Sequence, residues 1–357
     1  MSKEPGAFSF AEITSQPNVW PQTVATIQQQ TNAIQALYRS KRFDRVLFTG
    51  CGSTYYLSQI GAALFQQAVG VNSRAYPGSE LALMPDLTLV PNTTPLLIAV
   101  SRSGETTETL AAVRVFRERT QNPVIAVTCD PKSSLAAAAD FTISLPEAQE
   151  QSLAQTRSFS SMLIVVQVIA ALLSERENLS AITDIGTIAA RLINEHGGLA
   201  RTLGEDQQIK RFFFLGSGPL YGIACEGMLK MKEMSLSYSE AFHVLEFRHG
   251  PMSMVNENAL VVGMLSEEAH AQEVAVLNEM RKRGAQILVQ GVPDHREGLD
   301  SGAHFVPIGW TLPRWARPVT YLPVLQLLAY HRALSNGQDP DRPANLTFVI
   351  SLNPSMM

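Results

Sequence analysis

Short apolar runs alternate with longer amphipathic stretches over the first half of the chain. Strands are predicted at four such runs: residues 45–50, 96–100, 123–128 and 141–145. Apolar residues recur at helical spacing in the stretches that follow the first two runs, residues 51–69 and 106–120. Continuous apolar strands separated by helices are typical of a parallel sheet that is covered on both faces. The sequence therefore predicts an α/β fold.

The same pattern starts again near residue 212. Strands are predicted there at residues 212–216, 260–265, 285–292 and 304–309, with a helix at 271–284. Four positions of the two halves fall in register, namely Phe48, Gly50, Gly52 and Tyr55 with Phe214, Gly216, Gly218 and Tyr221. The repeat predicts two subdomains, each a three-layer, flavodoxin-like or Rossmann-like unit with a parallel sheet flanked by helices. We expect an N-terminal helical segment over 1–40, subdomains over 41–185 and 200–350, and a tail over 351–357.

Composition narrows the class of protein. With 357 residues, the chain is long enough for two domains, and its 45% hydrophobic and 17% charged residues are typical of a globular protein. The net charge of −4 and the scattered Lys and Arg residues exclude a basic nucleic-acid patch. Three widely spaced cysteines, Cys51, Cys129 and Cys225, indicate buried thiols in a reducing compartment.

No signal peptide or membrane span is expected. The N-terminus MSKEPGAFSF lacks an apolar segment and a cleavage site of small residues. The longest apolar run, residues 162–173, is interrupted by Gln167 and is too short to cross a bilayer, so it predicts a buried helix. We expect a cytoplasmic protein.

Both glycine turns differ from a dinucleotide-binding fingerprint. Gly50-Cys51-Gly52 lacks the third glycine, and no acidic residue follows about 20 positions later at the end of a second strand. A nicotinamide cofactor is therefore not expected, and no other cofactor is indicated. A glycine turn before a helix still presents free backbone N–H groups to an anion.

The stretch SRSGETTET follows the apolar run at 96–100 directly. Ser101, Ser103 and Thr106 place hydroxyl groups at the end of a strand and in the first turn of a helix, and Gly104 allows close approach to the backbone. These groups suit a phosphate monoester. The alternative is an ordinary helix cap at Ser103, which accounts for one hydroxyl of the group.

A second group of polar residues lies in CEGMLKMKEMS. Glu226, Lys230 and Glu233 are spaced i, i+4 and i+7, so they project from one face of a helix. Apolar neighbours favour a buried face with a carboxylate acting as a general base, and the alternative is a solvated stripe. His249 precedes the Gly250-Pro251 turn, which suits an acid–base role in a cleft. No spacing of Cys, His or acidic residues indicates a metal site.

Six motifs together resemble one known family. In chain order they are CGST, SRSGETTET, EQSLAQTRSF, EGMLKMKE, EFRHGP and DRPANL, and the match begins at the motif EITSQP, residues 12–17. In this order the chain is similar to the sugar isomerase (SIS) family, in particular the isomerase part of glucosamine-6-phosphate synthase and its stand-alone deaminase and deglycase relatives. The resemblance implies two SIS subdomains in a homodimer that acts on a phosphorylated amino sugar or ketosamine.

Roles for single residues also follow from the resemblance. It implies that the sugar phosphate is held by the turn at Gly52 and by Ser53, Thr54, Ser101, Arg102, Ser103 and Thr106. Glu233 matches the base that moves a proton between C1 and C2, and His249 matches a histidine that opens the sugar ring from the neighbouring subunit. Glu226 and Lys230 match polar residues of the same helix. Leu153 and Gln155 lie on a loop that borders the substrate.

Three departures from the synthase pattern shape the predicted reaction. No glutaminase domain and no Cys at position 2 are present, so glutamine is not the expected ammonia donor. Phe348 stands where the synthase has a Schiff-base lysine, and Arg102 where it has glutamine, adding a charge that suits the phosphate.

These features favour a deaminase that converts glucosamine 6-phosphate to fructose 6-phosphate and ammonia. The alternatives are a fructosamine-6-phosphate deglycase and a non-catalytic sugar-phosphate sensor.

Overall fold

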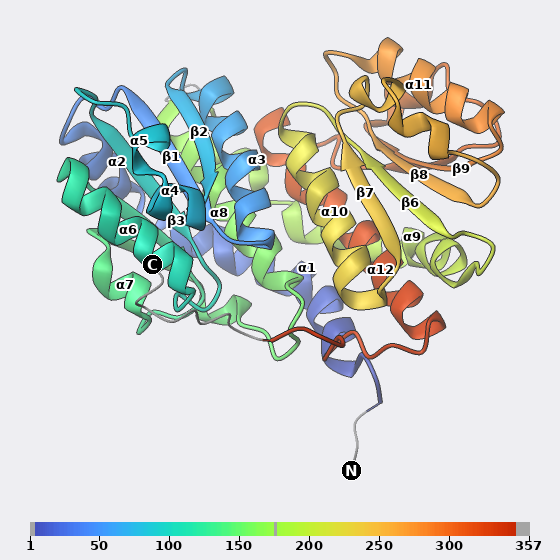
Figure 1. The fold of residues 1–357 in the computed structure, drawn as a ribbon, viewed down its shortest axis with the longest axis horizontal. Coiled ribbons are helices and arrows are strands. Elements are labelled where there is room, and N and C mark those ends of the chain that lie inside the picture. The colour runs from blue at the N-terminus through green and yellow to red at the C-terminus, as the bar shows by residue number, and fades with distance from the viewer. Residues whose placement is uncertain (1–3, 175–176, 348–357) are drawn as a thin grey trace. The chain divides into compact units, whose positions relative to one another are not determined.

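The computed structural model describes residues 4–174 and 177–347. These residues form two compact units (Figure 1). The first unit comprises the described residues of Asn18–Glu150 and Arg157–Thr183, together with Thr347. The second unit comprises residues 4–17, Gln151–Thr156 and Asp184–Leu346. The short segment Gln151–Thr156 therefore belongs to the second unit although it lies between two parts of the first.

The first unit contains five parallel strands in the order β2-β1-β3-β4-β5. Their bounds are β1 (Arg45–Gly50), β2 (Asn72–Pro77), β3 (Pro95–Val100), β4 (Val124–Thr128) and β5 (Phe141–Ser144). The helices are α2 (Thr31–Arg39), α3 (Ser53–Ala68), α4 (Gly78–Leu83), α5 (Pro85–Thr88), α6 (Thr107–Thr120), α7 (Ser134–Ala138) and α8 (Arg157–Ser174), with 3₁₀ turns η1 (Pro146–Ala148) and η2 (Leu179–Ile182). Helix α1 (Ala7–Gln28) begins in the second unit and ends in the first.

Alternate residues of these strands face two helical layers. On one face, strand residues such as Leu97 and Ala126 pack with Phe116 of α6 and Leu135 of α7. On the other face, Phe48 of β1 meets Phe65 of α3 with ring centroids 5.0 Å apart. Strands buried on both sides need apolar residues at successive positions, which explains the continuous apolar runs in the sequence.

Helix α8 is a buried core element. It is the single helix among residues 4–174 and 177–347 that is long and apolar enough to cross a membrane by length and composition. Positions 158–173 are all buried, and the helix packs against α3 and α2. The predicted buried helix at residues 162–173 is therefore confirmed.

The second unit repeats the first topology. Its parallel strands lie in the order β10-β9-β8-β6-β7 and have the bounds β6 (Arg211–Leu215), β7 (Tyr238–Phe242), β8 (Ala259–Met264), β9 (Gln286–Gly291) and β10 (His304–Pro307). The helices are α9 (Ile185–Glu205), α10 (Pro219–Ser235), α11 (His270–Lys282) and α12 (Leu322–Ser335). The 3₁₀ turns are η3 (Glu246–Arg248), η4 (Pro251–Met254), η5 (Pro293–Arg296), η6 (Arg314–Ala316) and η7 (Pro318–Tyr321).

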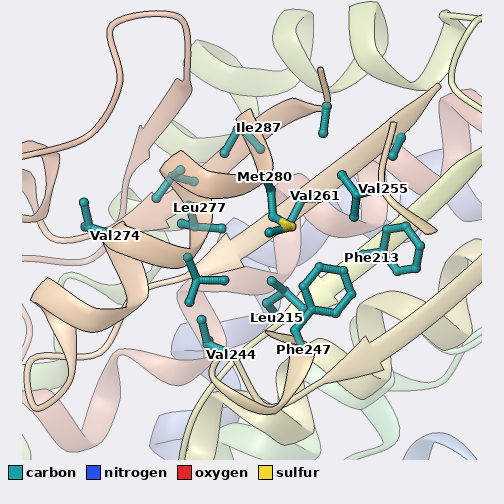
Figure 2. Packing of buried hydrophobic residues seen from close by; sticks show 14 of the residues in the cluster. Phe213, Leu215, Val244, Phe247, Val255, Val261, Val274, Leu277, Met280 and Ile287 are labelled. Atoms are coloured by element: carbon teal, nitrogen blue, oxygen red, sulfur yellow. The ribbon is translucent and has the colours of Figure 1, made fainter. Parts of the chain in front are cut away.

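Helix α11 covers one face of the second sheet. Figure 2 shows Leu277 and Met280 of this helix among Phe213, Val261 and Ile287 from three neighbouring strands. Helix α12 packs against both α9 and α10, and α10 also contacts β6 and β7.

Each sheet follows the flavodoxin-like strand order, so the predicted α/β class with two repeated subdomains is confirmed. The predicted domain limits stay predictions.

Candidate active site

The two glycine turns have nearly the same backbone conformation. Gly52 has φ 56° and ψ −125° before α3, and Gly218 has φ 55° and ψ −130° before α10. A positive φ favours glycine, and neither helix start receives a side-chain capping hydrogen bond. In the first turn, the Thr54 hydroxyl accepts the Cys51 N–H at 2.9 Å. The N-terminus of α3 therefore lies at the carboxyl end of β1, beside the point where the strand order reverses.

The hydroxyl-rich turn lies at the carboxyl end of the adjacent strand β3. Helix α6 begins at Thr107, and the side chain of its N-cap residue, Thr106, makes no capping hydrogen bond. The alternative interpretation, in which Ser103 caps this helix, is therefore wrong. The hydroxyls of Ser101 and Thr106 are 3.2 Å apart, and Ser101 Oγ accepts the Gly104 N–H at 3.1 Å. The hydroxyls of Ser101 and Thr106 thus lie together at the N-terminal end of α6.

The turn is held by the N-terminal end of α7. Gly104 has φ 65°, and a Cβ at this position would lie 2.1 Å from Ser133 Oγ, so only glycine fits. The Glu105 carboxylate accepts hydrogen bonds from the Ser134 N–H at 2.6 Å and from its hydroxyl at 2.8 Å. These contacts fix the backbone that carries the candidate phosphate ligands.

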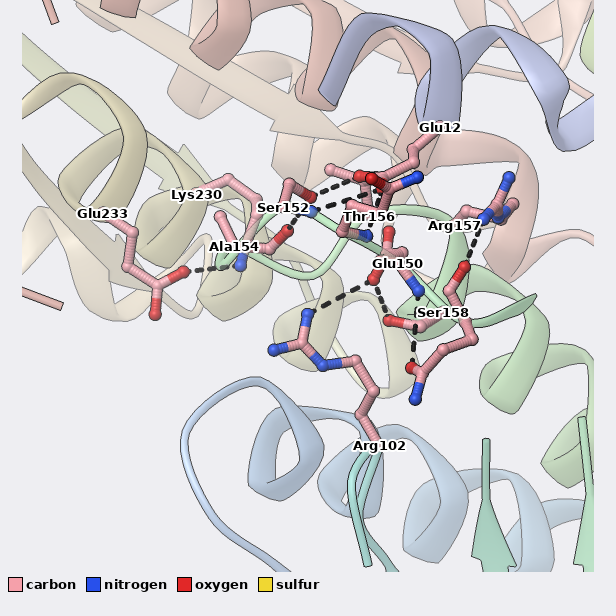
Figure 3. A network of polar contacts seen from close by, with 12 residues as sticks. Glu12, Arg102, Glu150, Ser152, Ala154, Thr156, Arg157, Ser158, Lys230 and Glu233 are labelled. Atoms are coloured by element: carbon pink, nitrogen blue, oxygen red, sulfur yellow. Dashed lines mark hydrogen bonds and ion pairs between the residues drawn. The ribbon is translucent and has the colours of Figure 1, made fainter. Parts of the chain in front are cut away.

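Arg102 is directed into the protein. Its side chain is 5% exposed and forms an ion pair of 3.5 Å with the fully buried Glu150. The same carboxylate accepts a hydrogen bond from the Ser158 hydroxyl (Figure 3). Because the guanidinium already has a carboxylate partner, its pairing with a phosphate stays a prediction.

Three charged residues of α10 form a separate candidate group in the second unit, and the predicted shared face is confirmed. The Lys230 ammonium lies 2.6 Å from Glu233 Oε2 and 3.4 Å from Glu226 Oε1. Glu226 and Lys230 are each 1% exposed, so the alternative of a solvated stripe is wrong, whereas Glu233 is 21% exposed. Within the described chain, the other carboxylate oxygen of Glu233 has no hydrogen-bond partner.

The two histidines that follow β7 differ in setting. His249 follows η3, is exposed, and its imidazole makes no hydrogen bond or ion pair with any described residue. His243, for which the sequence suggested no role, stacks on Tyr221 at the start of α10, with ring centroids 3.8 Å apart. Partial burial lowers the pKa of His243, although much of its side chain is exposed.

The loop Gln151–Thr156 carries two further predicted residues, Leu153 and Gln155. The Leu153 N–H donates to the Asp341 carbonyl at 2.9 Å. The amide oxygen of Gln155 is buried and accepts no hydrogen bond from the described part of the chain. A buried acceptor without a donor is costly, which makes this oxygen a candidate ligand contact.

The thiols are not suited to attack a substrate. Burial raises the pKa of Cys51 and of Cys129, and it raises the pKa of Cys225 to about 11. Cys129 and Cys225 are buried as predicted, whereas Cys51 is half-buried. Among the described residues, no three His, Cys, Asp or Glu side chains are grouped to hold a metal ion.

The SIS domain matches residues 37–172 and 207–289, more than half of the chain and one stretch in each repeat. The chain belongs to the SIS-domain family. One relative in this family is the glutamine–fructose-6-phosphate aminotransferase (isomerizing) of Methanothermobacter thermautotrophicus. It is 25% identical over 346 residues, which covers 97% of this chain and 57% of the relative. The chain therefore spans little more than half of that protein.

Solved SIS structures share the fold over almost the whole chain. The glucosamine-6-phosphate deaminase from Thermotoga maritima is 27% identical with a TM-score of 0.78, and the match covers 97% of this chain and 100% of that one. The tagatose-6-phosphate ketose/aldose isomerase from Escherichia coli is 24% identical with a TM-score of 0.85, and the match covers 96% and 98%.

Membership of the SIS-domain family does not test the roles assigned to single site residues, which stay predictions. Phe348 lies outside the described residues. The structure brings the hydroxyl-rich turn and the Gly52 turn to adjacent strand ends, and it gathers Glu226, Lys230 and Glu233 on α10. Sequence reasoning missed Glu105 and Glu150, which hold the hydroxyl-rich turn and Arg102. Each is separated from its partner by about 30 to 50 positions, so no local pattern marked the contact.

Proposed function

We propose that the protein is an amino-sugar-phosphate isomerase that deaminates glucosamine 6-phosphate. The products are fructose 6-phosphate and ammonia, with one water consumed. The observation that carries this proposal is the arrangement on α10, where Lys230 binds one oxygen of Glu233 and leaves the other open. An oriented, partly exposed carboxylate is the group that proton transfer between neighbouring carbons requires.

The phosphate end of the substrate is assigned to the first unit. The hydroxyls of Ser53, Thr54, Ser101, Ser103 and Thr106 and the N-termini of α3 and α6 would supply hydrogen bonds to its oxygens. Two neighbouring helix ends at one sheet edge also provide a positive potential. A phosphate-binding site of this kind does not need a lysine.

Glu233 is assigned to the proton transfer. In the open-chain aldehyde, it removes the proton from C2, the electron pair forms the C1–C2 double bond, and O1 takes up a proton to give the enol. Return of the proton from Glu233 to C1, with loss of one proton from the C2 amine, gives the C2 imine of fructose 6-phosphate. Water then adds to C2, and ammonia leaves. Lys230 holds the carboxylate in place during both steps, and Glu226 balances the charge of Lys230.

Ring opening is assigned to His249, which would act in the site of a second copy of the chain. The support is that its imidazole is exposed and has no partner within the described chain. The Gly250-Pro251 turn, with φ 120° at Gly250, directs the backbone out of η3. A homodimer with shared sites follows from this assignment.

The amine end of the substrate is assigned to the loop Gln151–Thr156. The buried amide oxygen of Gln155 would accept a hydrogen bond from the amino group or a hydroxyl of the sugar. A site that hydrogen-bonds a substrate group discriminates strongly against analogues that lack it.

The test is a product assay with matched variants. Purified protein and glucosamine 6-phosphate should yield fructose 6-phosphate and ammonia in equal amounts, and Glu233→Gln should be nearly inactive. Turnover no higher than that of Glu233→Gln would exclude the proposal. A panel of fructosamine 6-phosphates, compared by kcat/KM, separates deamination from deglycation. Thermal stabilisation by hexose phosphates without any product would instead indicate a sensor.

A further inference from the structure

A buried carboxylate of α1 binds the first part of the loop Gln151–Thr156. Glu12 is 4% exposed, and its Oε1 accepts the N–H groups of Gln151 at 2.6 Å and of Ser152 at 3.3 Å. Its Oε2 accepts the hydroxyl of Ser152 (Figure 3). Three donors from two successive residues thus meet one carboxylate. Glu12 is the glutamate of EITSQP, a motif to which the proposed reaction assigns no role.

The same motif also reaches the end of the loop. Pro17 has no N–H, so the Ile13 carbonyl lacks its usual partner in the helix. The side-chain amide of Gln16 donates to this carbonyl at 2.9 Å and to Gln326 Oε1 at 2.9 Å. Gln326 in turn donates to the Thr156 carbonyl at 3.0 Å. The proline of the motif thereby frees an acceptor that positions Gln16.

Asp341, the first residue of DRPANL, makes the third contact. Its carbonyl accepts the Leu153 N–H at 2.9 Å, in the middle of the loop. Its carboxylate accepts the N–H groups of Phe8 at 2.9 Å and Ser9 at 2.6 Å in the first turn of α1. The loop is therefore bonded at its start, middle and end by side chains or backbone that α1 orients.

This number of contacts is large for six residues without helix or strand. Fixing the backbone of each residue costs roughly 1–2 kcal/mol of conformational entropy, so a loop of this length does not stay in one shape without such bonds. The loop belongs to the second unit, as do Lys230 and Glu233, and Figure 3 shows Ser152 together with these two residues. Between the bonded positions lies Gln155, whose buried oxygen has no donor in residues 4–174 and 177–347.

We propose that Glu12 is a positioning residue: by binding Gln151 and Ser152, it sets the loop so that Gln155 meets the amine end of the phosphosugar. This assignment rests on the proposed function of the loop. Glu12 does not touch the substrate, so its effect is expected on how well the sugar is recognised. Phosphate binding, which is assigned to the first unit, should not change.

The second unit offers a matched control. Glu273 is also fully buried and also accepts the N–H and the hydroxyl of one serine, Ser266, at 2.7 and 3.0 Å. Glu273 belongs to α11 and bonds no residue of the loop. The substitutions Glu12→Gln and Glu273→Gln therefore each remove the charge from a buried carboxylate that binds a serine, and only Glu12 bonds the loop, with three donors against two at Glu273.

The experiment compares both variants with the wild-type protein in three measurements. For Glu12→Gln, we expect kcat/KM for glucosamine 6-phosphate to fall about 10- to 100-fold, as is typical of a displaced positioning group. The inhibition constant of inorganic phosphate should stay within about twofold of the wild-type value. Loss of even one hydrogen bond to the phosphate would change this constant by more than that. Amide exchange of residues 151–156 should become faster. Glu273→Gln should leave all three measurements unchanged.

Two results would overturn the assignment. One is an equal loss of kcat/KM in both variants, which would make Glu12 a general stabiliser. The other is unchanged amide exchange of the loop in Glu12→Gln. If the wild-type protein has no turnover, the proposed function fails. Amide hydrogen exchange of residues 151–156 then tests the role of Glu12 in the loop. In that case, slower exchange of residues 151–156 with fructose 6-phosphate in the wild type but not in Glu12→Gln supports it, and no difference rejects it.

Discussion

Replacing Lys230 with methionine removes a buried cation that lies between two carboxylates of α10. Methionine keeps the length and most of the volume of the side chain, so the change is mainly one of charge. Glu226 is left with its side chain 1% exposed and its cation gone, whereas Glu233 is 21% exposed and can recover part of its hydration. The cost should therefore come mostly from Glu226.

The distances set the size of the effect. At an effective dielectric constant of about 20, two unit charges 3.4 Å apart interact with about 5 kcal/mol. Removing one partner of a buried pair typically costs about 3–5 kcal/mol, because the remaining charge stays desolvated. For a domain of 150–250 residues, this corresponds to a melting temperature that is lower by roughly 6–20 °C. The double substitution Lys230→Met with Glu226→Gln removes both charges and should recover most of this loss.

Differential scanning calorimetry of the wild type, the two single variants and the double variant measures this cycle. A Lys230→Met protein that melts within 2 °C of the wild type, a shift expected for less than about 1 kcal/mol, would refute the reasoning. So would a double variant less stable than Lys230→Met, because then Glu226 would not be the stranded charge. Activity should be lost in both Lys230 variants, since Glu233 loses the group that orients it.

Three further predictions concern the phosphate seat, the dimer and pH. Replacing Ser101 and Thr106 together with alanine should raise KM in a normally folded protein, since each hydrogen bond to a charged group contributes about 1.5–3 kcal/mol; an unchanged KM places the phosphate elsewhere. Glu233→Gln and His249→Ala homodimers should each be nearly inactive, and subunit exchange between them should restore activity toward about a quarter of the wild-type value; no recovery after verified exchange places His249 in its own chain's site. Burial, followed by the nearby His270 charge, lowers the pKa of His295 in the folded protein. As the pH falls below about 6.5, the imidazole is therefore protonated in the unfolded chain before it is protonated in the folded one, which favours unfolding. The melting temperature should therefore fall from pH 7 to pH 5, less steeply in His295→Gln, and equal slopes in calorimetry would contradict this.

Two strands, β2 and β7, were not predicted from the hydrophobic pattern of the sequence. β2 and β7 occupy corresponding edge positions in the two sheets. Their sequences, NSRAYP and YSEAF, contain few apolar residues, because an edge strand is covered less completely than a central one. The central strands, buried on both faces, were all predicted. Helix α9 was also missed and lies where a connection between the subdomains was expected.

In the candidate site, too, features set by local sequence were predicted and contacts between distant residues were not. The common face of Glu226, Lys230 and Glu233 follows from helical spacing alone, and the hydroxyl-rich turn follows from local sequence. The contact of Arg102 with Glu150 and that of Glu12 with Ser152 join residues 48 and 140 positions apart. Such contacts depend on how the chain folds back, and no local periodicity encodes them.

The position of the apolar helix α8 in the chain matters for folding during synthesis. As a nascent segment it resembles a membrane-spanning helix, and it exposes a large aggregation-prone surface until it is covered. The elements against which it packs most, α3 and α2, both precede it in the chain, as do all five strands of the first sheet. A ribosome therefore delivers α8 after its binding surface has emerged. A circular permutation that started the chain at α8 would reverse this order and lengthen the exposure of the helix.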